Sequence, residues 1–273
     1  MAANKQKMSR SKILVESALM VAVATVLSLV KLLDLPYGGA VTVGCMLPVI
    51  IISYRHGLKW GTLTGFVFAV IEQLLGLKNL SYVTTWQSIV AVILLDYLIA
   101  FMVIGWGGLF RKHMKQPTAL FAGTIFVCLL RYCCHVLSGA TVWAGLSIPT
   151  NAALLYSLGY NATYMLPETI VTAVLAYYLG SMLDFGSEQI VPYGGSSVSR
   201  SSLLLKGIGG LIFAAAIVID AILIFSKLQN AETGAFDATG FAAVNLPLLL
   251  IITLAGVVCF VVLIIVANRQ DET

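Results

Sequence analysis

Five ionisable side chains lie inside long apolar stretches of the first two-thirds of this sequence, where a charged group is costly and usually has a partner or a function. They are Glu72, Asp96, Arg131, His135 and Glu168. Because Arg131 and His135 are four residues apart, a helix would place both on one face. Asp96 has no basic residue in its own apolar stretch, so its carboxylate needs a partner from another segment or a ligand.

Polar and aromatic residues accompany these charges. Asn161, Tyr164 and Glu168 are spaced i, i+3 and i+7, so they share one helix face. Two connections near the charged stretches contain Trp86 and Trp143. Ring faces beside a carboxylate suit a small ligand with flat rings and hydrogen-bonding edges, including a cationic ring. The pattern therefore predicts a small-molecule pocket.

Each member of this set also has a structural interpretation. Trp and Tyr are enriched at membrane interfaces whatever the function. Arg131 can neutralise Glu72 or Glu168 as a structural ion pair, and His135 can be a hydrogen-bonded core residue. The constellation favours the pocket more strongly than any single member does.

Composition indicates the surroundings of these side chains. The 273 residues are 59% hydrophobic and 10% charged, with a mean hydropathy of +0.96, whereas a soluble domain is about 25% charged. Lipid must therefore be the solvent, and the predicted fold class is all-α, a multi-pass transmembrane helix bundle. We expect eight spans, at 13–33, 40–54, 60–77, 87–109, 119–139, 160–183, 203–227 and 242–267.

A polar, Gly/Ser-rich stretch divides the chain after the sixth span. We expect a six-helix substrate-capture domain over 1–184, a cytoplasmic linker over 185–202 and a two-helix membrane extension over 203–273. Lys and Arg concentrate in connections that share one side with the N-terminus, so the positive-inside rule places both termini in the cytoplasm. The predicted pocket then opens outward.

Several classes of function lack support. The sequence contains no GxxxxGK[ST], GxSxG or HExxH motif, so the chain does not hydrolyse ATP itself and we expect no enzyme. Its five cysteines form no CxxC pair and fit no zinc spacing, so no metal or cofactor is expected. The basic clusters are short and juxtamembrane, which argues against nucleic-acid binding.

Three segments carry a more specific pattern: HVLSGATVW (135–143) followed by YSLGYN (156–161), LDYL (95–98) followed by GGLF (107–110), and SYRHGLK (53–59). On these segments, and from about Lys12 to Leu183, the chain resembles the thiamine-specific capture subunits (S components) of energy-coupling factor (ECF) vitamin importers. The resemblance implies a six-helix bundle in the plasma membrane that binds thiamine near the outer face. It also implies three partners, a transmembrane coupling subunit and two cytosolic ATPases.

The resemblance implies roles for individual residues. His135, Tyr156 and Asn161 stand where the family hydrogen-bonds thiamine, and Trp143 stands where a ring stacks on it. Asp96 stands at the position of an acidic residue, often Glu, that contacts the aminopyrimidine.

Further positions of the family pattern lie beside the pocket and on the first helix. Tyr97 and Trp86 match neighbouring aromatic positions. Ala18 and Ala22 match the small residues through which the first helix docks on the coupling subunit, and small residues do permit close helix approach.

The first outer loop departs from the family pattern. Gly39 stands where some members carry a capping Trp, so either Tyr37 caps the ligand or the loop closes differently. The sequence also leaves two other functions open. One is a self-sufficient proton-coupled transporter with Glu72, Arg131 and Glu168 as a relay, and the other is a membrane enzyme.

Overall fold

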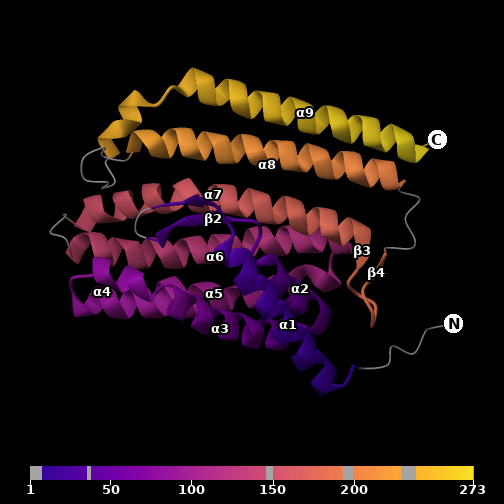
Figure 1. The fold of residues 1–273 in the computed structure, drawn as a ribbon, viewed down its shortest axis with the longest axis horizontal. Coiled ribbons are helices and arrows are strands. Elements are labelled where there is room, and N and C mark those ends of the chain that lie inside the picture. The colour runs from indigo at the N-terminus through magenta and orange to yellow at the C-terminus, as the bar shows by residue number, and fades with distance from the viewer. Residues whose placement is uncertain (1–7, 36–37, 146–149, 193–198, 229–237, 273) are drawn as a thin grey trace.

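The computed structural model describes residues 8–35, 38–145, 150–192, 199–228 and 238–272. Most of these residues are helical, and the long helices lie side by side along one direction (Figure 1). The elements up to the sixth helix are α1 (Arg10–Leu29), β1 (Lys31–Asp34), β2 (Ala40–Thr42), α2 (Leu47–His56), α3 (Leu58–Leu75), η2 (Leu77–Tyr82), α4 (Trp86–Ala91), η3 (Val92–Ile99), α5 (Ala100–Met102), η4 (Val103–Trp106) and η5 (Leu109–Lys112). They are followed by α6 (Gln116–Gly145), α7 (Thr150–Met182), β3 (Leu183–Asp184), β4 (Val191–Pro192), α8 (Arg200–Leu228), η6 (Ala238–Ala243) and α9 (Leu246–Glu272).

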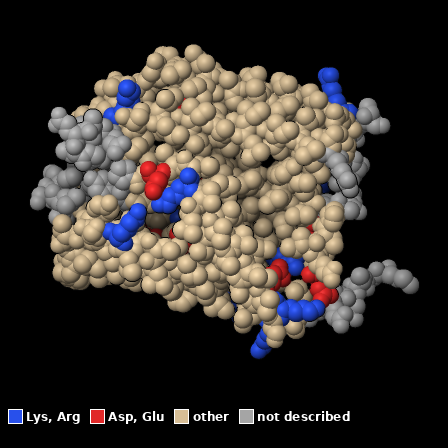
Figure 2. All heavy atoms as spheres, viewed as in Figure 1, with Lys and Arg blue, Asp and Glu red and all other residues tan. Residues whose placement is uncertain are grey.

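The prediction of an all-α, multi-pass membrane protein is confirmed. Charged side chains gather toward the two ends of the molecule, and the surface between them carries almost none (Figure 2). In lipid every backbone polar group must be satisfied within the protein, which helices achieve by themselves. Among the described residues, five helical segments are long and apolar enough to cross a membrane: Arg10–Leu29, Trp86–Lys112, Gln116–Val142, Ser201–Leu228 and Leu246–Gln270.

The start of the predicted span 40–54 is wrong. Residues 40–42 form β2, which pairs antiparallel with β1, and α2 begins only at Leu47. The turn between the strands includes Gly38, whose φ of 95° is a backbone conformation that favours glycine. A strand of three or four residues is too short to show the alternating pattern that identifies a strand. Hydropathy therefore does not separate these strands from the apolar helices beside them.

The predicted connection between spans five and six is also largely helical. α6 continues to Gly145 and α7 already begins at Thr150, ten residues before the predicted start of span 160–183. Hydropathy marks only the part of a helix that is apolar enough for lipid, whereas the helix itself continues as long as its backbone bonds do.

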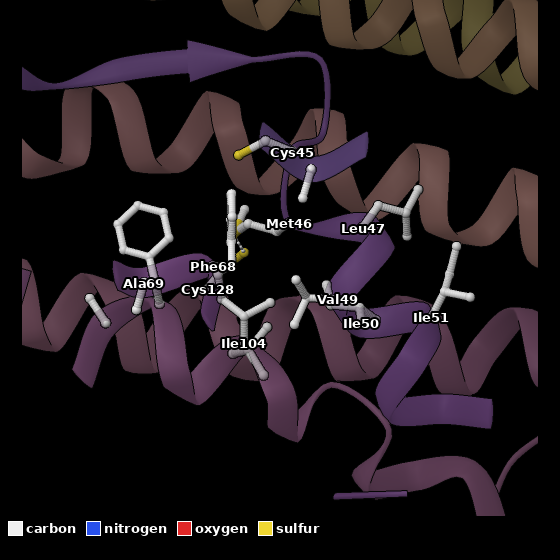
Figure 3. Close-up of a cluster of buried hydrophobic side chains, with 14 of the residues drawn as sticks. Cys45, Met46, Leu47, Val49, Ile50, Ile51, Phe68, Ala69, Ile104 and Cys128 are labelled. Carbon is white, nitrogen blue, oxygen red and sulfur yellow. Dashed lines mark hydrogen bonds between the residues drawn. The ribbon is translucent and has the colours of Figure 1, made fainter. Parts of the chain in front are cut away.

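The short helix α2 lies in the middle of the bundle and supplies much of its core. Val49, Ile50 and Ile52 of α2 have no exposed surface. Figure 3 shows this buried cluster, in which α2 side chains face Phe68 of α3 and Ile104 of η4. Because α2 has ten residues and is buried on several sides, it is an internal helix surrounded by longer ones.

The last two helices form a layer against α7. α8 packs on α7, and α9 packs on the far side of α8 (Figure 1). The rings of Phe213 in α8 and Phe260 in α9 stack with centroids 5.8 Å apart. Asp220, the acidic residue in the middle of α8, accepts a hydrogen bond from Thr253 Oγ1 of α9. Apolar packing and the hydrogen bond between Asp220 and Thr253 therefore both join the two helices of this layer.

Candidate functional site

A cavity of about 420 Å³ lies between the β1–β2 hairpin and the neighbouring helix ends. This volume falls within the range of small-molecule sites. Its walls come from the last turns of α1 and α3, from η3, from α6 and from the middle of α7. The polar lining consists of Ser28, Lys31, Asp34, Thr42, Glu72, Lys78, Asn79, Asp96, Arg131, His135, Asn161 and Glu168.

An unusual helix segment turns Asp96 and Tyr97 toward the cavity, although these residues are consecutive. The helix is π-helical over Val92–Ile99. π-Helical stretches are rare and frequently occur at functional sites. Tyr97 is held from the other side, because its hydroxyl accepts a hydrogen bond from Asn79 Nδ2 at 2.8 Å and donates one to Gly76 O at 3.3 Å.

Asp96, His135 and Arg131 form a line of contacts into the bundle. His135 Nδ1 lies 2.9 Å from Asp96 Oδ1, and His135 Nε2 lies 3.4 Å from Arg131 Nη2. Because a guanidinium can only donate, Nε2 acts as the acceptor and the proton belongs on Nδ1, from where it is donated to Asp96. These partners thus fix the histidine as the Nδ1–H tautomer.

Arg131 has no carboxylate partner within 4 Å among the described residues. Its guanidinium carbon lies 4.4 Å from the ring centroid of Phe101, and Nη1 contacts Met46 Sδ at 2.8 Å. The predicted structural ion pair with Glu72 or Glu168 is therefore wrong. A cation over a ring face is stabilised without a carboxylate, which leaves Arg131 as a fixed positive charge in the cavity wall.

The two glutamates are each held by a hydroxyl group. Ser28 Oγ donates to Glu72 Oε1 at 2.6 Å, which joins α1 to α3. The hydroxyl of Thr42 donates to Glu168 Oε1 at 2.8 Å, and the backbone N–H of Thr42 donates to the other oxygen. Glu168 therefore fixes β2 to α7.

Three side chains of α7 complete the wall. Tyr164 Oη donates to Asn161 Oδ1 at 2.6 Å, while Asn161 Nδ2 donates to Ser157 O at 2.8 Å. Tyr160 Oη accepts the backbone N–H of Gly39 at 3.1 Å. The rings of Tyr160 and Tyr164 are thereby fixed beside the cavity, with centroids 5.7 Å apart.

The lining residues carry unequal numbers of opposite charges. Four are acidic (Asp34, Glu72, Asp96 and Glu168) and three are basic (Lys31, Lys78 and Arg131), so the formal charge is −4 + 3 = −1 with neutral histidine. A ligand with one positive charge would balance this excess. Ring faces beside the carboxylates add to the attraction for a cationic ring.

Comparison with known proteins identifies the fold that encloses this cavity. A family model described as thiamine transporter protein (Thia_YuaJ) matches residues 14–184. This chain belongs to the thiamine transporter family. The match ends before α8, so the last two helices lie outside the part that defines the family.

Individual members of the thiamine transporter family are also similar to this chain. The thiamine transporter ThiT of Bacillus subtilis is 34% identical over 178 residues, which cover 59% of this chain and 86% of the relative. ThiT of Lacticaseibacillus paracasei is 26% identical over 207 residues, covering 70% of this chain and 96% of the relative. The solved structure of ThiT from Listeria monocytogenes has a TM-score of 0.52 at 23% identity, covers 63% of this chain and 94% of that chain, and shows the same fold.

The structure brings together four of the predicted binding residues of this thiamine transporter family member. Asp96, Tyr97, His135 and Asn161 all line the cavity. Tyr156 is not among the lining residues, and it packs against the buried apolar cluster that contains Tyr160 and Tyr164.

The tryptophans and the loop residue have other positions. Trp86 begins α4, is 70% exposed and does not line the cavity. Tyr37 and the side chain of Trp143 lie outside the described residues. Ala18 and Ala22 lie one turn apart on the exposed face of α1, where another helix can approach closely.

Sequence reasoning missed the residues at the rim of the cavity. Lys31 and Asp34 pair at 2.8 Å across one edge, and Asn79 reaches Tyr97 from η2. The signal that could have found them is the break in apolar pattern at KLLD and at KN, where charged or amide groups follow the ends of apolar helices.

The departure at Gly39 has a structural reason. A Cβ at this position would lie 2.6 Å from Cδ1 of Tyr164 and 2.9 Å from Tyr160 Oη. No larger side chain fits unless these rings move, so this loop closes by packing its backbone on α7.

Proposed function

We propose that this chain is the thiamine-binding membrane subunit of an ECF-type, ATP-driven importer. In this proposal it captures thiamine from outside the cell and releases it inside after the bundle topples against a coupling subunit. Two cytosolic ATPases supply the energy, and the chain itself catalyses no covalent reaction. Support comes from membership of the thiamine transporter family and from the chemistry of the cavity.

The observation that carries the proposal is the carboxylate of Asp96 at the cavity. One oxygen is bonded to His135, and the second has no hydrogen-bond partner among the described residues. The side chain is 27% exposed, so a ligand can reach it. The free oxygen can accept a hydrogen bond from the exocyclic amine of an aminopyrimidine, a charge-assisted bond that is roughly twice as strong as a neutral one.

The rest of the cavity suits the second half of thiamine. A thiazolium ring carries one positive charge, which would balance the formal excess of one carboxylate in the lining. Tyr97 and Tyr164 offer ring faces in the cavity wall, and such faces attract cations. We assign the predicted stacking role to Trp143 and the predicted hydrogen-bonding roles to His135 and Asn161. Tyr156, also expected to bind thiamine through a hydrogen bond, is not among the lining residues, so we assign it the support of Tyr160 and Tyr164 in the wall.

We further propose that both termini are cytoplasmic and that the protein resides in the plasma membrane. The cavity lies near the last turns of α1, α3 and α6. The basic residues Arg55 of α2 and Arg111 of η5 come just before the first turns of α3 and α6, at the end of the bundle away from the cavity. By the positive-inside rule the basic end is cytoplasmic, and the cavity then opens outward. The exposed alanines Ala18 and Ala22 would receive the coupling subunit.

Binding of thiamine to the purified full-length protein tests the proposal. Thiamine should quench the tryptophan fluorescence with high affinity, and the affinity should fall at least about tenfold in Trp143→Ala or Asn161→Ala, since one lost interaction of about 1.4 kcal/mol has this effect. Affinity unchanged in both variants would contradict the proposed site. A tag after Thr273 should be accessible only from the cytoplasmic side.

A proton-coupled carrier is the second candidate, because Glu72 and Glu168 line the cavity within the bundle. Among the described residues, no hydrogen bond joins Arg131 to either glutamate, so a relay between them would need water. Uptake into cells separates the two candidates. Loss of uptake when the partner ATPases are deleted supports the importer, whereas uptake that survives the deletion and collapses with an uncoupler supports the carrier.

A further inference from the structure

Side chains of the cavity wall and the end of α8 belong to one buried apolar cluster. Leu35, Tyr160 and Tyr164 line the cavity. The same three side chains belong to a buried apolar cluster that includes Phe225 and Leu228 of α8. A helix outside the family match therefore lies directly behind the ligand-binding surface.

One face of the last two turns of α8 is turned toward this wall and away from the lipid. Phe225 is 7% exposed and Leu228 is fully buried. On the same helix Ile219 and Ile222 are 47% and 42% exposed, as expected for side chains that face lipid. The amphipathic end of α8 is thus directed at the hairpin and at α7.

The β1–β2 hairpin needs such support. It consists of strands of four and three residues, and an isolated two-stranded hairpin is marginally stable at best. One face is fixed to α7 by the bonds from Thr42 to Glu168 and from Gly39 to Tyr160. The apolar residues Leu35 and Val41, 4% and 0% exposed, pack in the cluster that contains the end of α8.

We propose that α8 contributes to ligand binding, with Phe225 and Leu228 as positioning residues. These two side chains hold the hairpin against α7 and thereby slow the dissociation of bound ligand. The identity of the ligand, thiamine, rests on the proposed function. The two residues contact no ligand themselves. Loss of either should therefore raise the dissociation rate more than it lowers the association rate, as is usual for substitutions around a formed site.

Dissociation of radiolabelled thiamine from the full-length protein, chased with excess unlabelled thiamine, tests this proposal. Phe225→Ala and Leu228→Ala should release thiamine at least about fivefold faster than the wild type. The conservative variant Phe225→Leu should restore most of the wild-type rate and serves if the alanine variant folds poorly. Phe213→Ala is the matched control, because it removes the same side chain from the same helix on the side that stacks on Phe260.

Amide hydrogen exchange of the hairpin without ligand provides a readout that does not depend on thiamine. The N–H of Leu35 donates to Gly39 O at 2.7 Å, and its exchange should accelerate in Phe225→Ala but not in Phe213→Ala. If the wild type fails to bind thiamine while exchange follows this pattern, the proposed function is wrong and the role of α8 stands. The role of α8 would be overturned if Phe225→Ala left hairpin exchange and thiamine release at the wild-type rates. It would also be overturned if Phe225→Ala and Phe213→Ala accelerated them to the same degree.

Discussion

Helices α1–α7 enclose a cavity lined by four carboxylates and three basic side chains, whereas α8 and α9 carry one acidic residue away from their ends, Asp220. Both regions are surrounded by lipid, where a polar group needs a partner. Asp220 finds its partner in a hydroxyl of the adjacent helix. Asp96 finds one in His135 of the neighbouring helix α6, and its second oxygen remains available at the cavity.

The difference shows what distinguishes a binding carboxylate from a structural one in this molecule. Residue type and position along the helix are alike in the two cases, and the sequence around each is apolar. What differs is the surroundings, because Asp96 faces ring systems and further charges across a cavity, and Asp220 faces the packed surface of α9. Substitutions in the two regions should therefore separate ligand binding from stability.

The largest effect on binding is expected for Asp96→Asn. The change removes the charge that balances a cationic ligand and leaves the His135 Nδ1–H with a weaker acceptor. A charge-assisted hydrogen bond contributes up to about 3 kcal/mol, so the thiamine affinity should fall roughly a hundredfold. Isothermal titration calorimetry measures it. Asp220→Asn is the control. A similar loss of thiamine affinity in the control would show that the two carboxylates do not differ in their role in binding.

The next effect concerns the close contact of the hairpin with α7. In Gly39→Ala the new methyl group would lie within 3 Å of Tyr160 and Tyr164, so the hairpin must move away from the wall. We expect about tenfold weaker thiamine binding, which corresponds to about 1.4 kcal/mol. Gly159→Ala in α7 has no atom within 4 Å of the new group and should bind as the wild type does. Unchanged affinity in both variants would show that the hairpin tolerates displacement.

A smaller loss is expected for Thr42→Val, which keeps the shape of the side chain and removes its hydrogen bond to Glu168. One such bond contributes about 1 kcal/mol, so the affinity should fall about fivefold. Combining Thr42→Val with Glu168→Gln in a double-mutant cycle measures the coupling of the pair. Additive effects would mean that the bond does not hold β2 in place for the ligand.

The smallest effect on binding, and a clear effect on stability, is expected for Thr253→Val. The change leaves the buried Asp220 without its hydroxyl donor, which costs about 1 to 3 kcal/mol. The midpoint of thermal unfolding should fall by a few degrees, in line with about 2–4 °C per kcal/mol for a chain of this size class, while thiamine affinity stays within about twofold.

The sequence predicted the membrane bundle, and it predicted part of the cavity wall for physical reasons. Helical spacing placed Arg131 and His135 on one face, and both line the cavity. Asp96 was expected to need a partner from another segment, and His135 is that partner. These predictions depended only on helix geometry and on the energetic penalty of charge in lipid.

Other parts of the site depend on contacts between segments that no local pattern records. Arg131 was expected beside a glutamate, but Ser28 and Thr42 already satisfy Glu72 and Glu168, and Phe101 offers the cation a ring face. Hydropathy assigns the strands of the β1–β2 hairpin to the ends of two spans because each strand is short and follows or precedes an apolar helix. The π-helical stretch that turns Tyr97 inward together with Asp96 leaves no mark in hydropathy.

The packing of α8 behind the cavity wall also limits how this chain can evolve. Leu35 and Val41 in the hairpin share one closed cluster with Phe225 and Leu228, nearly two hundred residues later in the sequence. In a close-packed interior, a change of volume on one side must be compensated on the other. Homologous chains that possess the last two helices should therefore show correlated substitutions between these distant positions, and chains that lack the helices should vary freely in the hairpin.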